Sequence, residues 1–181
     1  MAIIHDVPQA FSAAECDTLV ALGERVGLVP ATVWAGAGDQ VDPAARSART
    51  SHHPRGPETG WIYERLDRLF AEAGDAFGLA VGPLTEPLQI LRYDEGGHFR
   101  TWHSDAGYDA MDRRLVSVSV ELTALGDHEG GDLEIIPDTV GKRRTLARGG
   151  ARFFPSRAIH RVTPVTSGVR HALVIWTGGR A

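Results

Sequence analysis

The sequence predicts a mainly β protein, in which antiparallel strands form a sandwich or barrel and helices pack outside it. From about residue 86 onward, short β-branched and aromatic segments are separated by glycine-rich turns such as DEGG and GDHEGGD. Many short strands at this spacing are typical of sandwiches and barrels. In RRLVSVSVEL the valines alternate with Ser117, Ser119 and Glu121, which predicts one apolar and one polar face.

Two helices are expected in the first half of the chain. Ser12 and Glu15 form a capping-box pattern, and the apolar residues that follow keep helical spacing to about Val26. A second helix is expected over about 58–77, where leucines, alanines and phenylalanines recur on one stripe and Gly78 is placed to end it. Both stripes indicate contact with the core.

The segment between these helices opens as a short strand and then becomes loop-like, rich in glycine, small residues and arginine. A long loop in a compact domain is usually functional or disordered. We therefore treat 36–57 as a candidate lid that excludes water. Its Arg46 and Arg49 are candidate substrate contacts, although a solvated charge is the commoner role of such a residue.

Length and composition favour one domain over 1–181, with a helical support over about 1–85 and a β core over about 86–177. A formal net charge of -4 argues against nucleic acid as a partner. No signal-peptide pattern and no run of ~20 apolar residues is visible. The single cysteine, Cys16, cannot form an internal disulfide. We expect a cytoplasmic protein with no membrane partner, and oligomeric state stays open.

His103 and Asp105 lie one residue apart in HFRTWHSDAG. On a strand, residues i and i+2 point to the same side, so both side chains can reach one ion. His160 lies in a later strand or strand edge, and two histidines with one carboxylate are the ligands of the non-haem iron(II) facial triad. Arg170, ten residues further on, is suited to bind a carboxylate bidentately.

These residues resemble the iron- and 2-oxoglutarate-dependent dioxygenases, in particular the prolyl 4-hydroxylase-like branch. The resemblance is carried by LRYDEGGHFRTWHSD, RRLVSVSVELTALGDHEGGDLEI, GGARFFPSRAIHRVTPVTSGVR and HALVIWT, and more loosely by FSAAECDTLVAL near the start. It implies a double-stranded β-helix, a jelly roll of the cupin-like kind.

The resemblance also implies a role for each matching residue. His103, Asp105 and His160 would hold Fe(II), and Arg170 would bind the distal carboxylate of 2-oxoglutarate. Tyr93, Leu133 and Trp176 would surround this cosubstrate. O2 is the second cosubstrate, and stimulation by ascorbate is compatible with the family.

Two positions depart from the family pattern. Relatives carry a tyrosine that helps to hold the distal carboxylate, whereas the expected equivalent here is Glu121. His98 stands where many relatives have a polar amide, and we assign it no role. Asp105 is retained, and related halogenases replace this carboxylate by a small residue, so hydroxylation is the favoured outcome.

The predicted activity is hydroxylation of a C–H bond in a prolyl residue, an amino acid or a related small molecule, with succinate and CO2 as co-products. The sequence does not choose among these substrates or fix the regiochemistry. A non-catalytic jelly-roll binding module is the main alternative. A zinc hydrolase is the other, although no HExxH helix is present and a general base would be needed.

The remaining histidines are expected to be solvated or in loops. They are His52, His53, His128 and His171. Trp102, next to His103, is expected to face away from the metal and into packing.

Overall fold

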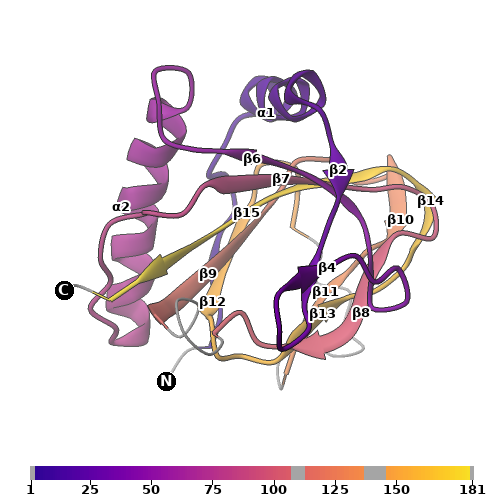
Figure 1. Cartoon of the computed structure of the whole chain (residues 1–181). Helices are drawn as coiled ribbons and strands as arrows, with labels where there is room; N and C mark the ends of the chain where they lie inside the picture. The colour runs from indigo at the N-terminus through magenta and orange to yellow at the C-terminus, as the bar shows by residue number, and fades with distance from the viewer. Residues whose placement is uncertain (1–2, 107–112, 137–145, 180–181) are drawn as a thin grey trace.

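The computed structural model describes residues 3–106, 113–136 and 146–179, and it is mostly β with two helices (Figure 1). Within these residues every pair of neighbouring strands is antiparallel. The larger sheet has seven strands in the order β1 (His5–Val7), β12 (Ala151–Pro155), β9 (Arg114–Glu121), β15 (Arg170–Gly178), β7 (Leu88–Tyr93), β6 (Arg49–His53) and β2 (Val29–Pro30).

A smaller sheet faces the larger one and completes the jelly roll. Its order is β11 (Leu133–Ile135), β13 (His160–Val162), β8 (His98–His103) and β5 (Arg46–Ser47). Two short ribbons join β10 (His128–Gly130) to β14 (Val165–Gly168), and β3 (Val33–Trp34) to β4 (Asp39–Gln40). The predicted β architecture with flanking helices is confirmed.

The helices lie against the outer face of the larger sheet (Figure 1). Helix α1 spans Ala13–Val26, and its capping box is formed, because the Ser12 hydroxyl accepts from the Glu15 N–H while the Glu15 carboxylate accepts from the Ser12 N–H. Helix α2 spans Gly60–Phe77 and ends at Gly78, whose φ of 68° is left-handed. Neither helix is long and apolar enough to cross a membrane, and no other helix occurs in the described ranges.

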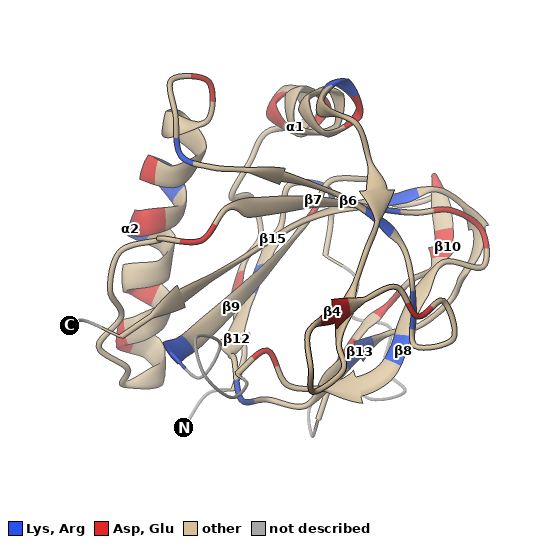
Figure 2. Cartoon of the chain, in the orientation of Figure 1, with Lys and Arg blue, Asp and Glu red and all other residues tan. Residues whose placement is uncertain are grey.

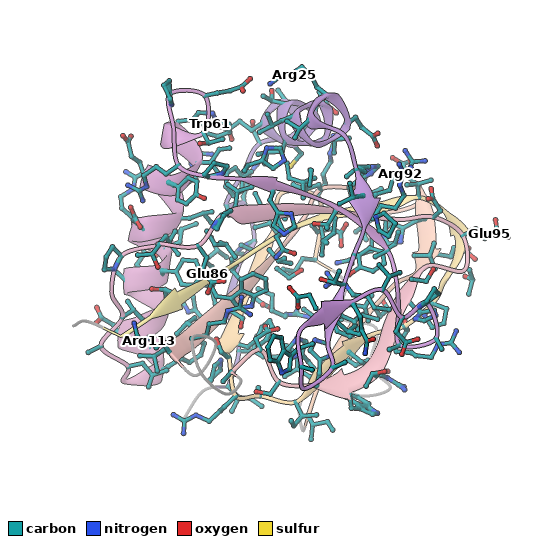
Figure 3. All side chains as sticks on the ribbon, in the orientation of Figure 1. Arg25, Trp61, Glu86, Arg92, Glu95 and Arg113 are labelled. Atoms are coloured by element: carbon teal, nitrogen blue, oxygen red, sulfur yellow. The ribbon has the colours of Figure 1, made fainter. Side chains whose placement is uncertain are left out.

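The main apolar core fills the space between these helices and the larger sheet (Figure 3). The alternating valines of β9 lie in it, and Phe70 of α2 meets Phe153 of β12 edge to face with ring centroids 5.1 Å apart. Charged residues of both signs remain on the solvent side of α1 and α2 (Figure 2). The stability of the domain therefore rests mainly on one face of the larger sheet.

The other face of the larger sheet looks into the jelly roll, toward the smaller sheet. A smaller apolar cluster around Leu91, Tyr93 and Val165 lies there. The polar residues of β9 also point this way, and Ser117 and Glu121 are buried. The polar face predicted for this strand is thus an interior wall rather than a solvated surface.

The segment expected to be a loop contains strands. β5 pairs with β8 at the edge of the smaller sheet, and β6 pairs with β7 in the larger sheet. The prediction of a structureless loop over 36–57 is therefore wrong for 39–40, which pair with β3, and for 46–47 and 49–53, which belong to the two larger sheets. The sequence hid them because arginine, serine and histidine replace the usual apolar alternation.

Glu15 links the two helices, and this contact predicts a pH-dependent stability. Hydrogen bonding from Arg65 of α2 and from the Ser12 N–H lowers the pKa of Glu15 from 4.5 to about 2. Because the folded-state pKa is depressed, the stabilisation is present above pH 4.5 and is lost as the pH falls toward about 2. Glu15→Gln should lower the free energy of unfolding at pH 7 by about 1 kcal/mol, since the contact is partly exposed.

Urea unfolding at several pH values checks this prediction. The difference between wild type and Glu15→Gln should shrink steadily below pH 4.5. The exposed Glu72 of α2 provides the control, since Glu72→Gln should change little at any pH. A Glu15→Gln difference that is independent of pH would contradict the proposed ionic origin.

Candidate metal centre

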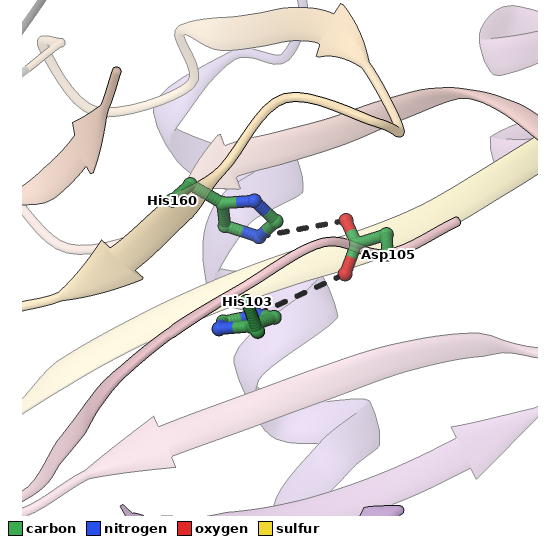
Figure 4. Close-up of side chains that lie close together, drawn as sticks. All are labelled: His103, Asp105 and His160. Carbon is green, nitrogen blue, oxygen red and sulfur yellow. Dashed lines mark ion pairs between the residues drawn. The ribbon is translucent and has the colours of Figure 1, made fainter. Parts of the chain in front are cut away.

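Two histidines meet where β13 pairs with β8. His160 is the register partner of His103, and their ring centroids are 4.2 Å apart. Asp105 follows β8 by two residues and turns its carboxylate toward both rings (Figure 4). Asp105 Oδ2 lies 3.5 Å from His160 Nε2, and Asp105 Oδ1 lies 3.9 Å from His103 Nε2. One potential ligand atom from each residue lies within 4.8 Å of the others.

Backbone carbonyls fix which ring nitrogen each histidine presents. His103 Nδ1 lies 2.8 Å from the Thr101 carbonyl oxygen, and His160 Nδ1 lies 2.9 Å from that of Ala158. A carbonyl can only accept, so each Nδ1 carries the proton and donates it. Both Nε2 atoms are therefore left with a free lone pair on the side of Asp105, as a metal requires.

The carboxylate of Asp105 is held from β9 and from the turn before β13. Ser117 Oγ donates to Asp105 Oδ2 at 2.7 Å, and Ser117 Oγ is 2.9 Å from Ser156 Oγ. The Ser156 carbonyl accepts from the backbone N–H groups of Asp105 and Ala106. These contacts fix both the backbone and the carboxylate plane of Asp105.

The protonation states suit a divalent cation. Burial and the neighbouring His160 lower the pKa of His103 to about 4, so its imidazole is neutral at pH 7. Burial alone would raise the pKa of Asp105, but the two histidines and the hydrogen bond from Ser117 outweigh it and lower this pKa. Neutral imidazoles and an ionised carboxylate are the forms that bind metal.

A stack of side chains supports His103 on its outer side. The Phe99 ring lies 3.7 Å from the His103 ring with 16° between their planes, and the Arg46 guanidinium lies 4.8 Å over Phe99. Arg46 donates to the Thr32 carbonyl, while its buried Nε has no hydrogen-bond partner among the described residues. Arg46 is thus held beside the candidate metal centre.

Arg49, the other arginine expected to contact substrate, lies elsewhere. It is exposed on β6 and donates to the Leu28 carbonyl. Its neighbours belong to the outer edge of the larger sheet, so the structure does not bring it to the histidines.

Arg170 lies inside the jelly roll at the start of β15. It is 4% exposed, and its Nε donates to Glu121 Oε2 at 2.9 Å. Burial alone would lower the pKa of Arg170, but the negative charge of Glu121 outweighs it and raises this pKa. Tyr93 is its register partner on β7, and the guanidinium lies 5.5 Å from the Tyr93 ring. Arg170 and Leu133 line one pocket, here called the arginine pocket, whose other lining residues are Ser119, Glu121, Gly131, Asp132, Leu146 and Arg152.

Trp176 lies on the same face of β15 as Arg170, but near the other end of the strand. The Arg114 guanidinium stacks 3.8 Å from the Trp176 ring and pairs with Glu86, with Nε 2.7 Å from Glu86 Oε1. Arg114 Nη1 also lies 3.5 Å from the Asp105 carbonyl oxygen. Trp176 is therefore grouped with Asp105, whereas Tyr93 and Leu133 are grouped with the arginine.

Several residues of the site were not singled out by the sequence. The alternation of β9 placed Ser117 on a polar face. No sequence pattern indicated a role for Ser156, which lies in the turn before β13. Two histidines expected to be solvated are buried, His53 at 3% and His128 at 4% exposure, so that prediction is wrong for them. Each lies on a short strand, β6 or β10, whose polar composition gave no strand signal in the sequence. Trp102 does point away from the metal, but it is 36% exposed beneath Arg161 rather than packed.

These residues fit an iron ion and a 2-oxo dicarboxylate. The histidine lone pairs and the Asp105 carboxylate match the donor set of the facial triad. Gly131 leaves room for the arginine, because a Cβ there would lie 2.8 Å from Arg170 Cδ. A jelly roll with this donor set and a buried arginine has the architecture of a facial-triad metalloprotein.

Comparison with known proteins agrees with that class. Residues 88–178 match the family model described as the 2OG-Fe(II) oxygenase superfamily. A PKHD-type hydroxylase of Methylobacterium nodulans is 32% identical over 78% of this chain and 68% of its own length. The chain therefore belongs to the 2OG-Fe(II) oxygenase superfamily.

A further relative is similar in sequence, and a solved structure is similar in fold. A PKHD-type hydroxylase of Delftia acidovorans is 37% identical over 62% of this chain. The crystal structure of a Pseudomonas putida prolyl-4-hydroxylase has a TM-score of 0.75 at 20% identity, covering 98% of this chain and 93% of that one. The chain spans about half the length of several curated relatives that it matches.

The support of Asp105 by Ser117 predicts an effect on metal affinity. Ser117→Ala removes the hydrogen bond to Asp105 Oδ2, and loss of such a contact to a metal ligand typically costs 10–100-fold in affinity. We expect Mn(II) binding, measured by calorimetry, to weaken by about tenfold. Ser119→Ala is the matched control, because Ser119 lies two residues away on the same face of β9 and lines the arginine pocket instead. Equal affinities in both variants would contradict this assignment.

Proposed function

We propose that this chain is an Fe(II)- and 2-oxoglutarate-dependent hydroxylase that oxidises a C–H bond of a prolyl residue, an amino acid or a related small molecule, releasing succinate and CO2. The observation that carries the proposal is the presentation of His103 Nε2 and His160 Nε2 toward Asp105, with both Nδ1 atoms committed to backbone carbonyls. Family membership and relatives named PKHD-type hydroxylase support it.

Different residues are proposed to bind the metal, the cosubstrate and the substrate. His103, Asp105 and His160 would hold Fe(II), and Arg170 would bind the distal carboxylate of 2-oxoglutarate against Tyr93 and Leu133. When bound, the iron with 2-oxoglutarate and O2 supplies the oxidation that places one oxygen atom on the substrate carbon and one in succinate. The protein contributes orientation and a buried site.

Arg46 is the candidate substrate contact. Its guanidinium is fixed by Thr32 and Phe99 next to His103, and its buried Nε lacks a partner among the described residues. An unsatisfied buried donor gains free energy when it meets an acceptor. We therefore favour a substrate that presents an oxygen acceptor beside the oxidised carbon, either the carboxylate of an amino acid or the carbonyl of a prolyl residue.

Zinc-dependent hydrolysis is the less favoured function. A hydrolase needs a general base near the metal-bound water. Glu121 is the carboxylate on the polar face of β9, and it is engaged by Arg170. A buried carboxylate committed to an arginine is poorly placed to take a proton from water.

Succinate release tests the proposed function. With Fe(II), 2-oxoglutarate and O2, the protein should convert 2-oxoglutarate to succinate faster when peptidyl-proline or amino-acid candidates are added, whereas Zn(II) should support no turnover. Arg170→Ala should sharply raise the 2-oxoglutarate concentration needed while leaving Fe(II) binding largely intact. Binding of both ligands without succinate from any candidate would favour the non-catalytic alternative.

Arg46→Ala tests the substrate contact. We expect KM for the accepted substrate to rise by about 10–100-fold, since a hydrogen bond to a charged group contributes about 1.5–3 kcal/mol. KM for 2-oxoglutarate should stay unchanged, because Arg46 does not line the arginine pocket. Arg49→Ala is the control and should behave as wild type. Equal losses in both variants would remove Arg46 from the substrate site.

A further inference from the structure

Glu121 forms a buried ion pair with the arginine of the proposed cosubstrate pocket. Glu121 ends β9 and Arg170 begins β15, and these strands are neighbours in the larger sheet. Glu121 is 5% exposed, and its Oε2 accepts from Arg170 Nε at 2.9 Å. The pair is therefore shielded from water. Charge interactions are stronger in such a buried environment than in solvent.

The geometry of the pair leaves half of the guanidinium available. Glu121 engages the Nε edge of Arg170, and in the described part of the chain the two Nη groups donate no hydrogen bond to protein. Gly131 lies against Arg170 Cδ, so the side chain has little room to turn. The Nη edge is thus presented in a fixed orientation to an incoming carboxylate.

The Glu121 carboxylate is itself held in place. The Thr123 N–H donates to Glu121 Oε1 at 3.3 Å, and His128 Nε2 lies 3.9 Å from the same oxygen. His128 is buried and its Nδ1 donates to the Gly130 carbonyl, so its position is also fixed, while its Nε2 has no hydrogen-bond partner among the described residues. One oxygen of Glu121 is therefore held by the Thr123 N–H and the other by Arg170 Nε.

The charge of the pocket is compensated before any cosubstrate enters. Glu121 and Asp132 line it together with Arg152 and Arg170, which gives two negative and two positive side chains. A distal carboxylate on the Nη edge would share Arg170 with Glu121, and two like charges at such short range repel. The pocket is preorganised, but its net attraction for a dianion is reduced.

We propose that Glu121 is a positioning residue that orients Arg170 for the distal carboxylate and, by its charge, lowers the affinity of the pocket for dicarboxylic 2-oxo acids. The inference rests on the proposed function, since it assumes that 2-oxoglutarate binds at Arg170. It assigns a role to the residue that replaces the family's expected tyrosine.

Two substitutions separate orientation from charge. Glu121→Gln keeps an oxygen acceptor for Arg170 Nε and removes the negative charge, so 2-oxoglutarate should bind roughly tenfold more tightly. Glu121→Asp keeps the charge but shortens the side chain away from Nε, so 2-oxoglutarate should bind more weakly than to wild type. Both affinities are measured by calorimetry on the Mn(II)-loaded full chain, which binds without turnover.

2-Oxopentanoate serves as the second probe, because it has the same chain length as 2-oxoglutarate but no distal carboxylate. Its affinity should be the same in wild type, Glu121→Gln and Glu121→Asp. Thermal unfolding gives an independent readout. Glu121→Gln should have a lower Tm without ligand, since Arg170 loses its counterion, and a larger rise in Tm on adding 2-oxoglutarate.

Glu134→Gln is the matched control. Glu134 is buried and accepts from Arg161 Nε at 2.7 Å, in the smaller sheet and outside the arginine pocket. Its substitution should lower Tm without changing the response to 2-oxoglutarate.

The results distinguish failure of the role proposed for Glu121 from failure of the proposed function. If wild type does not bind 2-oxoglutarate, the proposed function fails. If wild type binds it and Glu121→Gln binds it equally or more weakly, the inference alone is overturned. Parallel losses for 2-oxoglutarate and 2-oxopentanoate would make Glu121 merely structural. Should Glu121→Gln not fold, unchanged 2-oxoglutarate affinity in Glu121→Asp would overturn the orienting role.

Discussion

The register between β13 and β8 is the constraint on which the site depends. It places His160 opposite His103, and a slip of one residue would turn His160 to the other face of its sheet. Each imidazole then donates Nδ1–H to the carbonyl two residues before it, at Thr101 or Ala158. The backbone therefore sets both the position and the tautomer of the histidines. The carboxylate of Asp105 is oriented by its hydrogen bond from Ser117.

The strand β9 connects the metal centre to the arginine pocket. Its valines face the helices and contribute apolar burial, while its polar residues form an interior wall from Ser117, at Asp105, to Glu121, at Arg170. Buried polar groups of this kind are tolerated because each is hydrogen-bonded or paired. Stability and chemistry thus occupy opposite faces of one strand, which explains why a small jelly roll can hold a charged interior.

The sequence predicted the parts of this arrangement that have strong local signals. The capping box at Ser12, the helix end at Gly78 and the alternation in β9 all reappear in the structure. The ligands were grouped by spacing and family resemblance, and the structure places them together. The strands over 46–53 were missed, because their pairing partners are distant in sequence and their composition is polar. Ser156 was missed for the same reason, since its contact with Asp105 spans the fold.

The central claim is that backbone-fixed histidines and a glutamate-oriented arginine together define the site. A crystal structure with Mn(II) and 2-oxoglutarate bound tests it most directly. We expect the metal on His103 Nε2, His160 Nε2 and an Asp105 oxygen, with the distal carboxylate on the Nη edge of Arg170 while Nε stays on Glu121. A metal on either Nδ1, or a distal carboxylate that displaces Glu121 or lies away from Arg170, would contradict it.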